Sequence, residues 1–396
     1  MEFPEPDEPV ESTDPEDLKA RIDAGESVTI LDTRAPDEFE EWHLDGEGVT
    51  VANVPYWEFL EGVDDDTLAK VPEAPAGEPV VTVCAKGGSS EYVAGVLKEH
   101  GVEATNLAEG MNGWARLYEY RELDVPGDAV VAQYQRPSSG CLAYLVVSDG
   151  EAAVIDPLRA FADTYVRDAR ALGADLVYAI DTHVHADHLS GVRSLATDHD
   201  VTAVIPEPAV ARGVDYDVDY ETVAHGDVRS VGDVEIEVVH TPGHTTGMTS
   251  YLIDGSVLAT GDGLFVESVA RPDLEEGDDG APDAAATLYD SLQERVLTLP
   301  DDTLVAPAHF SDAADPREDG TYVESIGTLV RAMDALNMEK EEFVEFVLSD
   351  MPPRPANYED IIATNLGQND ATDEEAFELE LGPNNCAASR DAMTSD

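Results

Sequence analysis

The chain has 396 residues, of which 42% are hydrophobic, and its 85 acidic and 22 basic residues give a formal net charge of -63. This length and apolar content predict two or three domains with hydrophobic cores, while the excess of acids argues against binding to nucleic acid or to an anionic membrane. Because no apolar run approaches the roughly 18 residues of a membrane span, and because the acidic N-terminus is unlike a signal peptide, we expect a cytoplasmic protein.

The first part of the chain is expected to form a small α/β domain over residues 14–124, after an acidic, disordered leader at residues 1–13. Pro15 in the first turn of one helix and Gly101 after the last turn of another are typical of helix starts and ends. The alternation of strands and helices predicts a parallel sheet with helices packed on it. The expected elements are a helix at 14–24, strands at 28–32 and 80–84, and a helix at 92–100.

A second domain is expected over residues 128–367, followed by an acidic C-terminal tail at residues 368–396. Its first two strands flank Asp149 and Gly150, a pair that favours a tight hairpin turn. The expected strands lie at 142–147, 152–156, 176–180, 234–240, 257–260 and 303–306, and the expected helices at 161–172, 284–297, 322–337, 340–349 and 356–366.

The acidic residues are spread along the whole chain rather than gathered in one tail. Such self-repulsion strains a fold in dilute buffer, whereas at molar salt the Debye length falls to about 3 Å and the repulsion is screened. The composition resembles that of proteins from halophiles with a high-salt cytosol, and we expect a halophilic protein.

One short stretch, Thr182–His188, holds three histidines and an aspartate directly after the apolar run at 176–180. Further candidate ligands follow later strands: His244 in a turn, Asp262 after one strand and His309 after another. Neutral imidazole and carboxylate together suit zinc, iron or manganese. The pattern therefore predicts a metal site built from strand ends.

The order and spacing of these residues resemble those of the metallo-β-lactamase superfamily. The matching positions are His183, His185, Asp187, His188, His244, Asp262 and His309. The resemblance implies an αββα sandwich with the metal site at one edge of the sheets. This superfamily contains both hydrolases and oxygenases, so the fold alone does not name the reaction.

The sequence around the ligands resembles the persulfide dioxygenase branch of that superfamily, in four segments at 261–266, 270–274, 352–358 and 365–367. That resemblance implies one Fe(II) per chain. The implied ligands are His183, His244 and Asp262, which form the two-histidine, one-carboxylate triad of non-haem iron enzymes. The implied supporting residues are His185, Asp187, His188 and His309; in the superfamily's dinuclear hydrolases these four, with Asp262 bridging, would hold two zinc ions instead.

Two positions near the site carry separate expectations. Dioxygenases of this branch often have a tyrosine two residues after the last histidine, where this chain has Ser311. Arg271 could pair with a substrate carboxylate, or it could form a structural salt bridge.

A second candidate site is the loop that begins with Cys84, after the strand at 80–84 and before the helix at 92–100. Backbone amides and a helix N-terminus can surround an anion there and stabilise a thiolate or a persulfide. The other loop residues assigned to this anion cradle are Lys86, Gly87, Gly88, Ser89 and Ser90.

This loop resembles the active loop of the rhodanese family, in which cysteine is first, glycine fourth and serine seventh. Further resemblance lies at 31–34, at 38–43 and at 110–114. The resemblance implies a sulfurtransferase domain with Cys84 as the sulfur-carrying residue. Ser89 stands where an arginine is common and Trp42 where a glycine is common, so the sulfur donor is left open between thiosulfate and another compound.

Together the two resemblances imply an iron-dependent persulfide dioxygenase coupled to a sulfurtransferase. It would oxidise a low-molecular-weight thiol persulfide with O2 to sulfite, or give thiosulfate through a Cys84 persulfide. One alternative is a thioester hydrolase of the glyoxalase II type with two zinc ions, and the other is a non-enzymatic sulfur carrier or regulatory protein. The carrier thiol, the direction of sulfur transfer, homo-oligomer formation and the roles of Cys141 and Cys386 are left open at this point.

Overall fold

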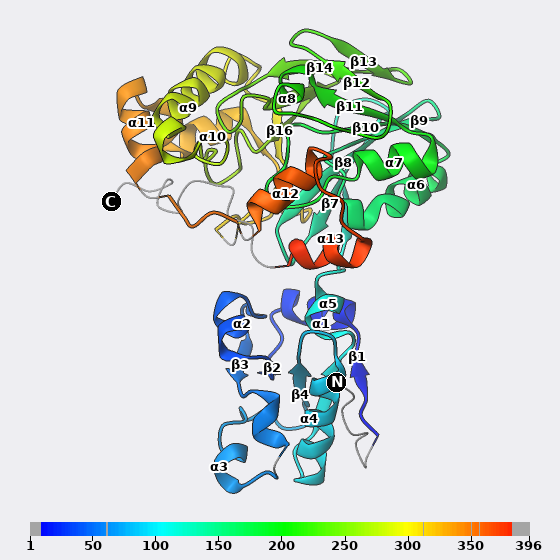
Figure 1. Cartoon of the computed structure of the whole chain (residues 1–396), viewed down its shortest axis with the longest axis vertical. Helices are drawn as coiled ribbons and strands as arrows, with labels where there is room; N and C mark the ends of the chain where they lie inside the picture. The colour runs from blue at the N-terminus through cyan, green and yellow to red at the C-terminus, as the bar shows by residue number, and fades with distance from the viewer. Residues whose placement is uncertain (1–8, 61, 312, 350, 356, 382–396) are drawn as a thin grey trace. The chain divides into compact units, whose positions relative to one another are not determined.

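The computed structural model describes residues 9–381 apart from residues 61, 312, 350 and 356. The chain divides into two units, the first ending at Leu117 and the second beginning at Tyr118. Each unit has its own sheets and its own hydrophobic core (Figure 1). No helix among the described residues is both long enough and apolar enough to span a membrane.

The first unit is one parallel sheet with helices on both faces. Its elements are β1 (Ser12–Thr13), α1 (Pro15–Asp23), β2 (Val28–Asp32), α2 (Pro36–Glu41), β3 (Val49–Asn53), η1 (Tyr56–Phe59), α3 (Asp65–Leu68), β4 (Val80–Val83), α4 (Gly88–Glu99), β5 (Ala104–Leu107) and α5 (Gly110–Trp114). The strands lie in the order β1-β5-β4-β2-β3. Successive side chains of β2 lie on opposite faces of the sheet. Ile30 packs in one buried cluster with Leu18 of α1, and Leu31 packs in another with Val93 of α4. The expected α/β domain with a parallel sheet is confirmed.

The second unit contains two sheets. The first has the order β12-β11-β10-β9-β8-β7-β6 and comprises β6 (Glu119–Glu122), β7 (Val130–Arg136), β8 (Cys141–Ser148), β9 (Glu151–Ile155), β10 (Asp175–Ile180), β11 (Thr202–Pro206) and β12 (Tyr220–Val223). The second has the order β13-β14-β15-β16-β17-β18 and comprises β13 (Val228–Val231), β14 (Val234–His240), β15 (Thr249–Ile253), β16 (Val257–Gly261), β17 (Leu304–Pro307) and β18 (Glu324–Ser325). The helical segments are η2 (Arg159–Phe161), α6 (Ala162–Ala171), α7 (Val192–His199), α8 (Glu207–Val210), α9 (Gly277–Ser291), η3 (Leu292–Val296), α10 (Ile326–Ala332), η4 (Asp334–Asn337), α11 (Lys340–Ser349), α12 (Tyr358–Asn365) and α13 (Asp373–Leu379).

The two sheets bury their facing sides against each other. Tyr144 and Ile155 of the first sheet share one buried cluster with Ile236 and Tyr251 of the second. Helices α6 and α7 cover the outer face of the first sheet, and α9, α10 and α11 cover the outer face of the second. This is the αββα sandwich that the metallo-β-lactamase resemblance implied.

The boundary between the units lies earlier than the expected residue 124. Strand β6 pairs with β7 in antiparallel register, and this pairing places residues 119–122 in the second unit. The expected disordered leader is also wrong at its end, because β1 pairs in parallel with β5. Residues 1–8 of that leader lie outside the described residues.

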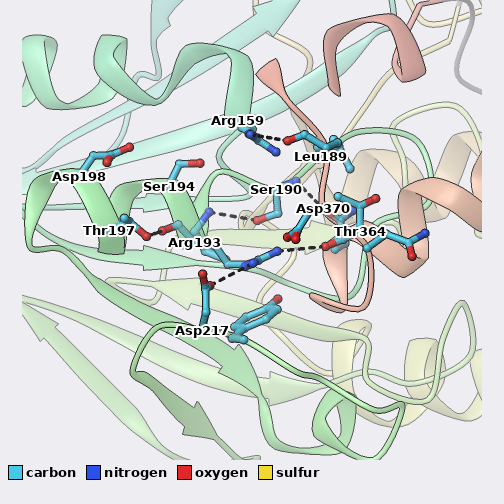
Figure 2. Close-up of a pocket in the computed structure, with 15 residues that line it drawn as sticks. Arg159, Leu189, Ser190, Arg193, Ser194, Thr197, Asp198, Asp217, Thr364 and Asp370 are labelled. Atoms are coloured by element: carbon cyan, nitrogen blue, oxygen red, sulfur yellow. Dashed lines mark hydrogen bonds and ion pairs between the residues drawn. The ribbon is translucent and has the colours of Figure 1, made fainter. Parts of the chain in front are cut away.

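The first part of the expected acidic tail at 368–396 is folded onto the second unit. Helix α13 begins with Thr372 as its cap, and Ala376 and Phe377 are buried. Residues 382–396, and Cys386 with them, lie outside the described residues. A pocket of about 180 Å³ lies beside α7 and is lined on its other side by residues of this C-terminal region (Figure 2).

Candidate metal centre and cysteine loop

The candidate metal ligands all follow strands of the sandwich. The loop that holds His183 begins directly after β10, and His244 lies in the turn after β14. Asp262 and His309 follow β16 and β17, which are neighbouring parallel strands, so their carboxyl ends lie at the same edge of the sheet. Gly261, the last residue of β16, allows this strand to lie close to Thr182, because a Cβ atom on Gly261 would lie 2.5 Å from the hydroxyl oxygen of Thr182.

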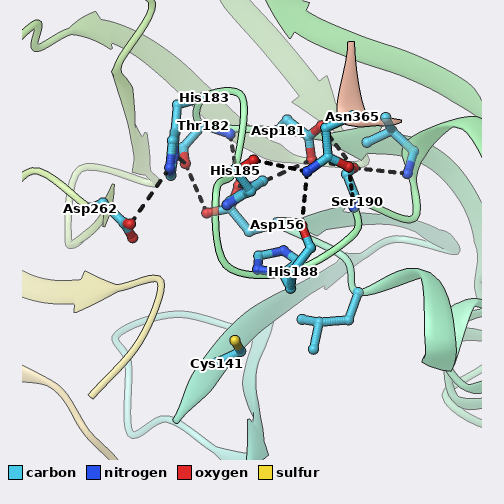
Figure 3. Close-up of polar contacts among 12 residues, drawn as sticks. Cys141, Asp156, Asp181, Thr182, His183, His185, His188, Ser190, Asp262 and Asn365 are labelled. Atoms are coloured by element: carbon cyan, nitrogen blue, oxygen red, sulfur yellow. Dashed lines mark hydrogen bonds and ion pairs between the residues drawn. The ribbon is translucent and has the colours of Figure 1, made fainter. Parts of the chain in front are cut away.

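Three of these side chains converge on one point. The Nε2 atoms of His183 and His244 lie 3.6 Å and 3.5 Å from Oδ2 of Asp262, and all three residues are buried. Figure 3 shows His183 and Asp262 facing each other. Among the described residues, neither of these Nε2 atoms nor Oδ2 of Asp262 has a hydrogen-bond partner. Buried polar atoms left in this state are costly, and a metal ion bound between them would satisfy all of them.

Hydrogen bonds behind the ligands orient the two imidazoles. Thr182 donates its hydroxyl proton to Asp156, so its oxygen is left to accept Nδ1–H of His183 at 2.9 Å. Nδ1–H of His244 donates to the carbonyl oxygen of Arg271 at 2.9 Å. In both residues Nε2 is then the lone-pair nitrogen and faces Asp262, the arrangement that metal-binding histidines need.

The electrostatics of the buried cluster keep these groups in metal-binding form. Burial, helped by the neighbouring His185, lowers the pKa of His183 to about 4, and burial also lowers the pKa of His244. Burial raises the pKa of Asp262, but the nearby His309 and His183 outweigh it and hold the pKa well below its usual range. The cluster therefore offers neutral imidazoles and an ionised carboxylate at neutral pH.

His309, Asp187 and His188 lie around this triad without joining it. Nδ1 of His309 is 3.0 Å from Oδ1 of Asp262. Asp187 and His188 form a second cluster with Cys141, whose ligand atoms lie within 4.8 Å of one another. Cys141 is buried, and its thiol donates to Oδ2 of Asp187.

His185 belongs to a third cluster, with two acids that the sequence analysis did not single out. Its Nε2 atom lies 3.1 Å from Asp156 and 3.8 Å from Asp181. Burial raises the pKa of Asp181 to about 7, against the influence of His185. Asp156 directly follows the strand β9, and Asp181 directly follows β10. An acid at the end of an apolar strand is the sequence feature by which both residues could have been recognised as site candidates.

Arg271 does not present its guanidinium to a substrate. Its side chain is buried and pairs with Asp273 through Nε at 2.8 Å and Nη2 at 3.0 Å. It also donates to the carbonyl oxygens of Pro352 and Pro353. Of the two roles that the sequence left open for Arg271, the structure shows the structural salt bridge.

Cys84 directly follows β4, and the turn after it leads into α4. The sulfur accepts hydrogen bonds from the amide of Gly87 and the hydroxyl of Ser90, both at 3.1 Å. The Ser90 hydroxyl also donates to Oδ1 of Asn106 of β5 at 2.7 Å, so its one proton is shared between the sulfur and this oxygen; the sequence analysis did not identify Asn106. Gly87 has a φ of 86°, which glycine adopts without strain. These donors suit a sulfur that carries negative charge.

Comparisons with known proteins match both units. The Rhodanese-like domain model matches residues 14–117, and the Metallo-beta-lactamase superfamily model matches residues 137–309. Human mitochondrial persulfide dioxygenase ETHE1 is 30% identical over 247 residues, which are 60% of this chain and 87% of that protein. The hydroxyacylglutathione hydrolase of Rhodospirillum rubrum is 31% identical over 188 residues, 45% of this chain and 67% of that protein.

Solved structures agree with these matches. The crystal structure of ETHE1 from Myxococcus xanthus is 30% identical, has a TM-score of 0.52, and covers 60% of this chain and 99% of its own. A metallo-beta-lactamase structure from Staphylococcus aureus has a TM-score of 0.57 at 24% identity, covering 62% of this chain and 75% of its own, which shows the fold.

Proposed function

Because this chain belongs to the ETHE1 family of the metallo-β-lactamase superfamily and carries a rhodanese-like domain before it, we propose that it is an iron-dependent persulfide dioxygenase coupled to a sulfurtransferase. Its substrates would be a low-molecular-weight thiol persulfide and O2. The net reaction is RSSH + O2 + H2O → RSH + H2SO3, in which the outer sulfur is oxidised to sulfite and O2 is reduced.

The observation that carries this proposal is the triad of His183, His244 and Asp262. It offers two lone-pair imidazole nitrogens and a carboxylate within 4.8 Å of one another. Two histidines and one carboxylate are typical of non-haem iron oxygenases. When bound there, the metal would supply redox activity and open coordination positions for the reactants.

The surrounding residues of the chain hold this triad in place. Thr182 and the Arg271 carbonyl orient the two imidazoles, and the burial of the triad excludes bulk water from the reacting atoms. Nδ1 of His309, 3.0 Å from Oδ1 of Asp262, places a titratable group next to the triad.

Cys84 would carry sulfane sulfur between the two reactions. Sulfite would attack the outer sulfur of a Cys84 persulfide; the S–S bond breaks, thiosulfate leaves, and the Cys84 thiolate is regenerated. The amide of Gly87 and the hydroxyl of Ser90 support this by stabilising negative charge on the sulfur.

The proposal is tested by O2 uptake with glutathione persulfide at high salt, together with the metal content of the purified protein. We expect one iron per chain, uptake that depends on persulfide, and loss of both metal and uptake in His183→Ala. Cys84→Ser should keep O2 uptake and lose thiosulfate formation. Undiminished uptake in His183→Ala would defeat the proposal.

A second candidate is a thioester hydrolase with two zinc ions. The cluster of Cys141, Asp187 and His188 beside the triad favours it, as does the similarity to hydroxyacylglutathione hydrolases. Two zinc ions per chain and hydrolysis of a glutathione thioester, without O2 uptake, would identify this function instead.

A further inference from the structure

The loop that carries the metal-site histidines has no regular secondary structure, so its backbone groups need other partners. We refer to residues 183–190 as the histidine loop. Several of its backbone partners come from one distant part of the chain, the C-terminal segment at residues 358–381, which contains α12 and α13.

Asn365, the last residue of α12, makes three hydrogen bonds to the histidine loop. Its Nδ2 donates to the carbonyl oxygens of His185 at 3.0 Å and His188 at 2.8 Å. Its Oδ1 accepts from the amide of Ser190 at 2.9 Å. A side-chain amide supplies two donors and an acceptor, so asparagine matches all three groups, whereas aspartate has no donor to offer. Figure 3 shows Asn365 next to Ser190 of this loop.

Glu380, just after α13, holds the loop at a second point. One carboxylate oxygen accepts from the amide of Leu189 at 2.6 Å, and the other pairs with Arg136 at 2.7 Å. The side chains of Glu380 and Arg136 are at most 1% exposed. The Arg136 guanidinium also lies over the rings of Phe161 and Phe377, at 5.6 Å and 5.4 Å. A buried charge pair of this kind has well-defined geometry, because each partner is costly to leave alone.

Contacts outside the loop anchor the same segment to the sandwich. Arg159 donates to the carbonyl oxygen of Ala371 at 3.0 Å, and Arg193 of α7 donates to the carbonyl oxygen of Thr364 at 3.4 Å. These contacts border the pocket in Figure 2. Ile361 of α12 packs with Leu189 of the loop.

We propose that Asn365 and Glu380 are positioning residues, through which the C-terminal segment sets the geometry of the histidine loop and thereby the metal affinity of the site. The groups that they bind belong to His185, His188, Leu189 and Ser190, in the same short loop as the ligand His183. Residues that orient metal ligands indirectly typically change metal affinity or activity by about 10- to 100-fold when they are removed.

The first test compares Asn365→Ala with Asn369→Ala in the full chain at high salt. Asn369 is an exposed asparagine of the same segment, and within the described part of the chain its side chain makes no hydrogen bond to the histidine loop, so it is a matched control. Cobalt(II) is the probe, since its visible absorption reports ligand geometry and competition with a chelator gives its affinity. We expect about a 10- to 100-fold weaker affinity and an altered spectrum in Asn365→Ala, with both unchanged in Asn369→Ala. Wild-type affinity and spectrum in a folded Asn365→Ala protein would overturn the proposal.

The second test uses the wild-type chain and so does not depend on a variant that folds. Coupling between two sites is reciprocal, so removing the metal should loosen the segment that holds the loop. Amide hydrogen exchange of metal-loaded and chelator-treated protein should therefore rise in peptides covering 183–190 and 358–367 together, with α9 as the unaffected reference. Unchanged exchange at 358–367 would contradict the proposal.

This inference rests on the metal site of the proposed function, but it does not depend on the identity of the metal or of the substrate. If wild-type protein takes up no O2 with persulfide, the proposed function fails and the positioning role stands. If the cobalt affinity is unchanged in Asn365→Ala and the exchange at 358–367 is unchanged on metal removal, only the positioning role fails.

Discussion

The Nδ1 atom of His244 donates a hydrogen bond to the backbone carbonyl of Arg271, while the Arg271 guanidinium pairs with Asp273. Arg271 therefore contributes to the metal site through its backbone carbonyl, which orients the ligand His244. Its guanidinium is paired with a buried carboxylate and not with a substrate. The salt bridge holds the same residue whose carbonyl orients His244, so we expect protein stability and metal binding to be coupled at Arg271.

Arg271→Ala is expected to destabilise the second unit. Removing one partner of a buried ion pair typically costs about 3–5 kcal/mol, and the loss should lie near the lower end because Arg354 also pairs with Asp273. The free energy of unfolding of the metal-free protein at high salt measures the effect. Arg354→Ala is the comparison, since its side chain is about one-third exposed and should cost far less. A loss of substrate affinity with unchanged stability in Arg271→Ala would contradict this reading.

Ser90→Ala is expected to make Cys84 less reactive. The variant removes a hydroxyl that donates to the sulfur at 3.1 Å, and a hydrogen bond to a charged group contributes about 1.5–3 kcal/mol. Alkylation of the Cys84 peptide by iodoacetamide, followed by mass spectrometry, should slow by about tenfold. Ser89→Ala is the matched control, because no hydrogen bond is described between Ser89 and the sulfur. Equal rates in the two variants would show that Ser90 does not stabilise the thiolate.

Gly261→Ala is expected to disturb the metal site. A Cβ atom there would lie 2.3 Å from Met248 and 2.5 Å from the Thr182 hydroxyl, which orients His183. Overpacking of this kind typically costs about 1–3 kcal/mol. Gly255→Ala is the control, since its φ of 66° is similar to the 53° of Gly261 and nothing lies within 4 Å of its added Cβ. We expect a lower unfolding temperature and less bound metal in Gly261→Ala than in Gly255→Ala; equal values would refute the prediction.

Salt is expected to stabilise the chain, in keeping with our proposal that it works in a halophilic cytosol. Raising KCl from about 0.1 M to about 1 M shortens the Debye length from about 10 Å to about 3 Å and screens the net charge of -63. The unfolding temperature should rise accordingly, and tetramethylammonium chloride at the same ionic strength should act similarly if screening is the cause. An unfolding temperature that is insensitive to both salts would exclude the halophilic interpretation.

The features that could be predicted from the sequence are those that short stretches of chain encode. The Thr182–His188 stretch and the Cys84 loop each combine a strand, a turn and their functional residues within a few positions. His244, Asp262 and His309 were recognisable because each also follows a strand, and parallel neighbours such as β16 and β17 end at the same edge. Local patterning therefore predicted the two-domain organisation, the parallel sheet of the first unit and the candidate ligands at strand ends, whereas the αββα sandwich of the second unit was implied by the resemblance to the metallo-β-lactamase superfamily.

Only the tertiary structure showed which charged and amide side chains bind partners that lie far away in the sequence. Glu380 looks in the sequence like any other acid of an acidic tail, yet it is buried against Arg136 and binds the Leu189 amide. Asn365 reaches the histidine loop across more than half of the second unit's sequence. Partners this far apart are brought together by the packing of the whole sandwich, and no local pattern distinguishes a buried, paired side chain from an exposed one of the same type.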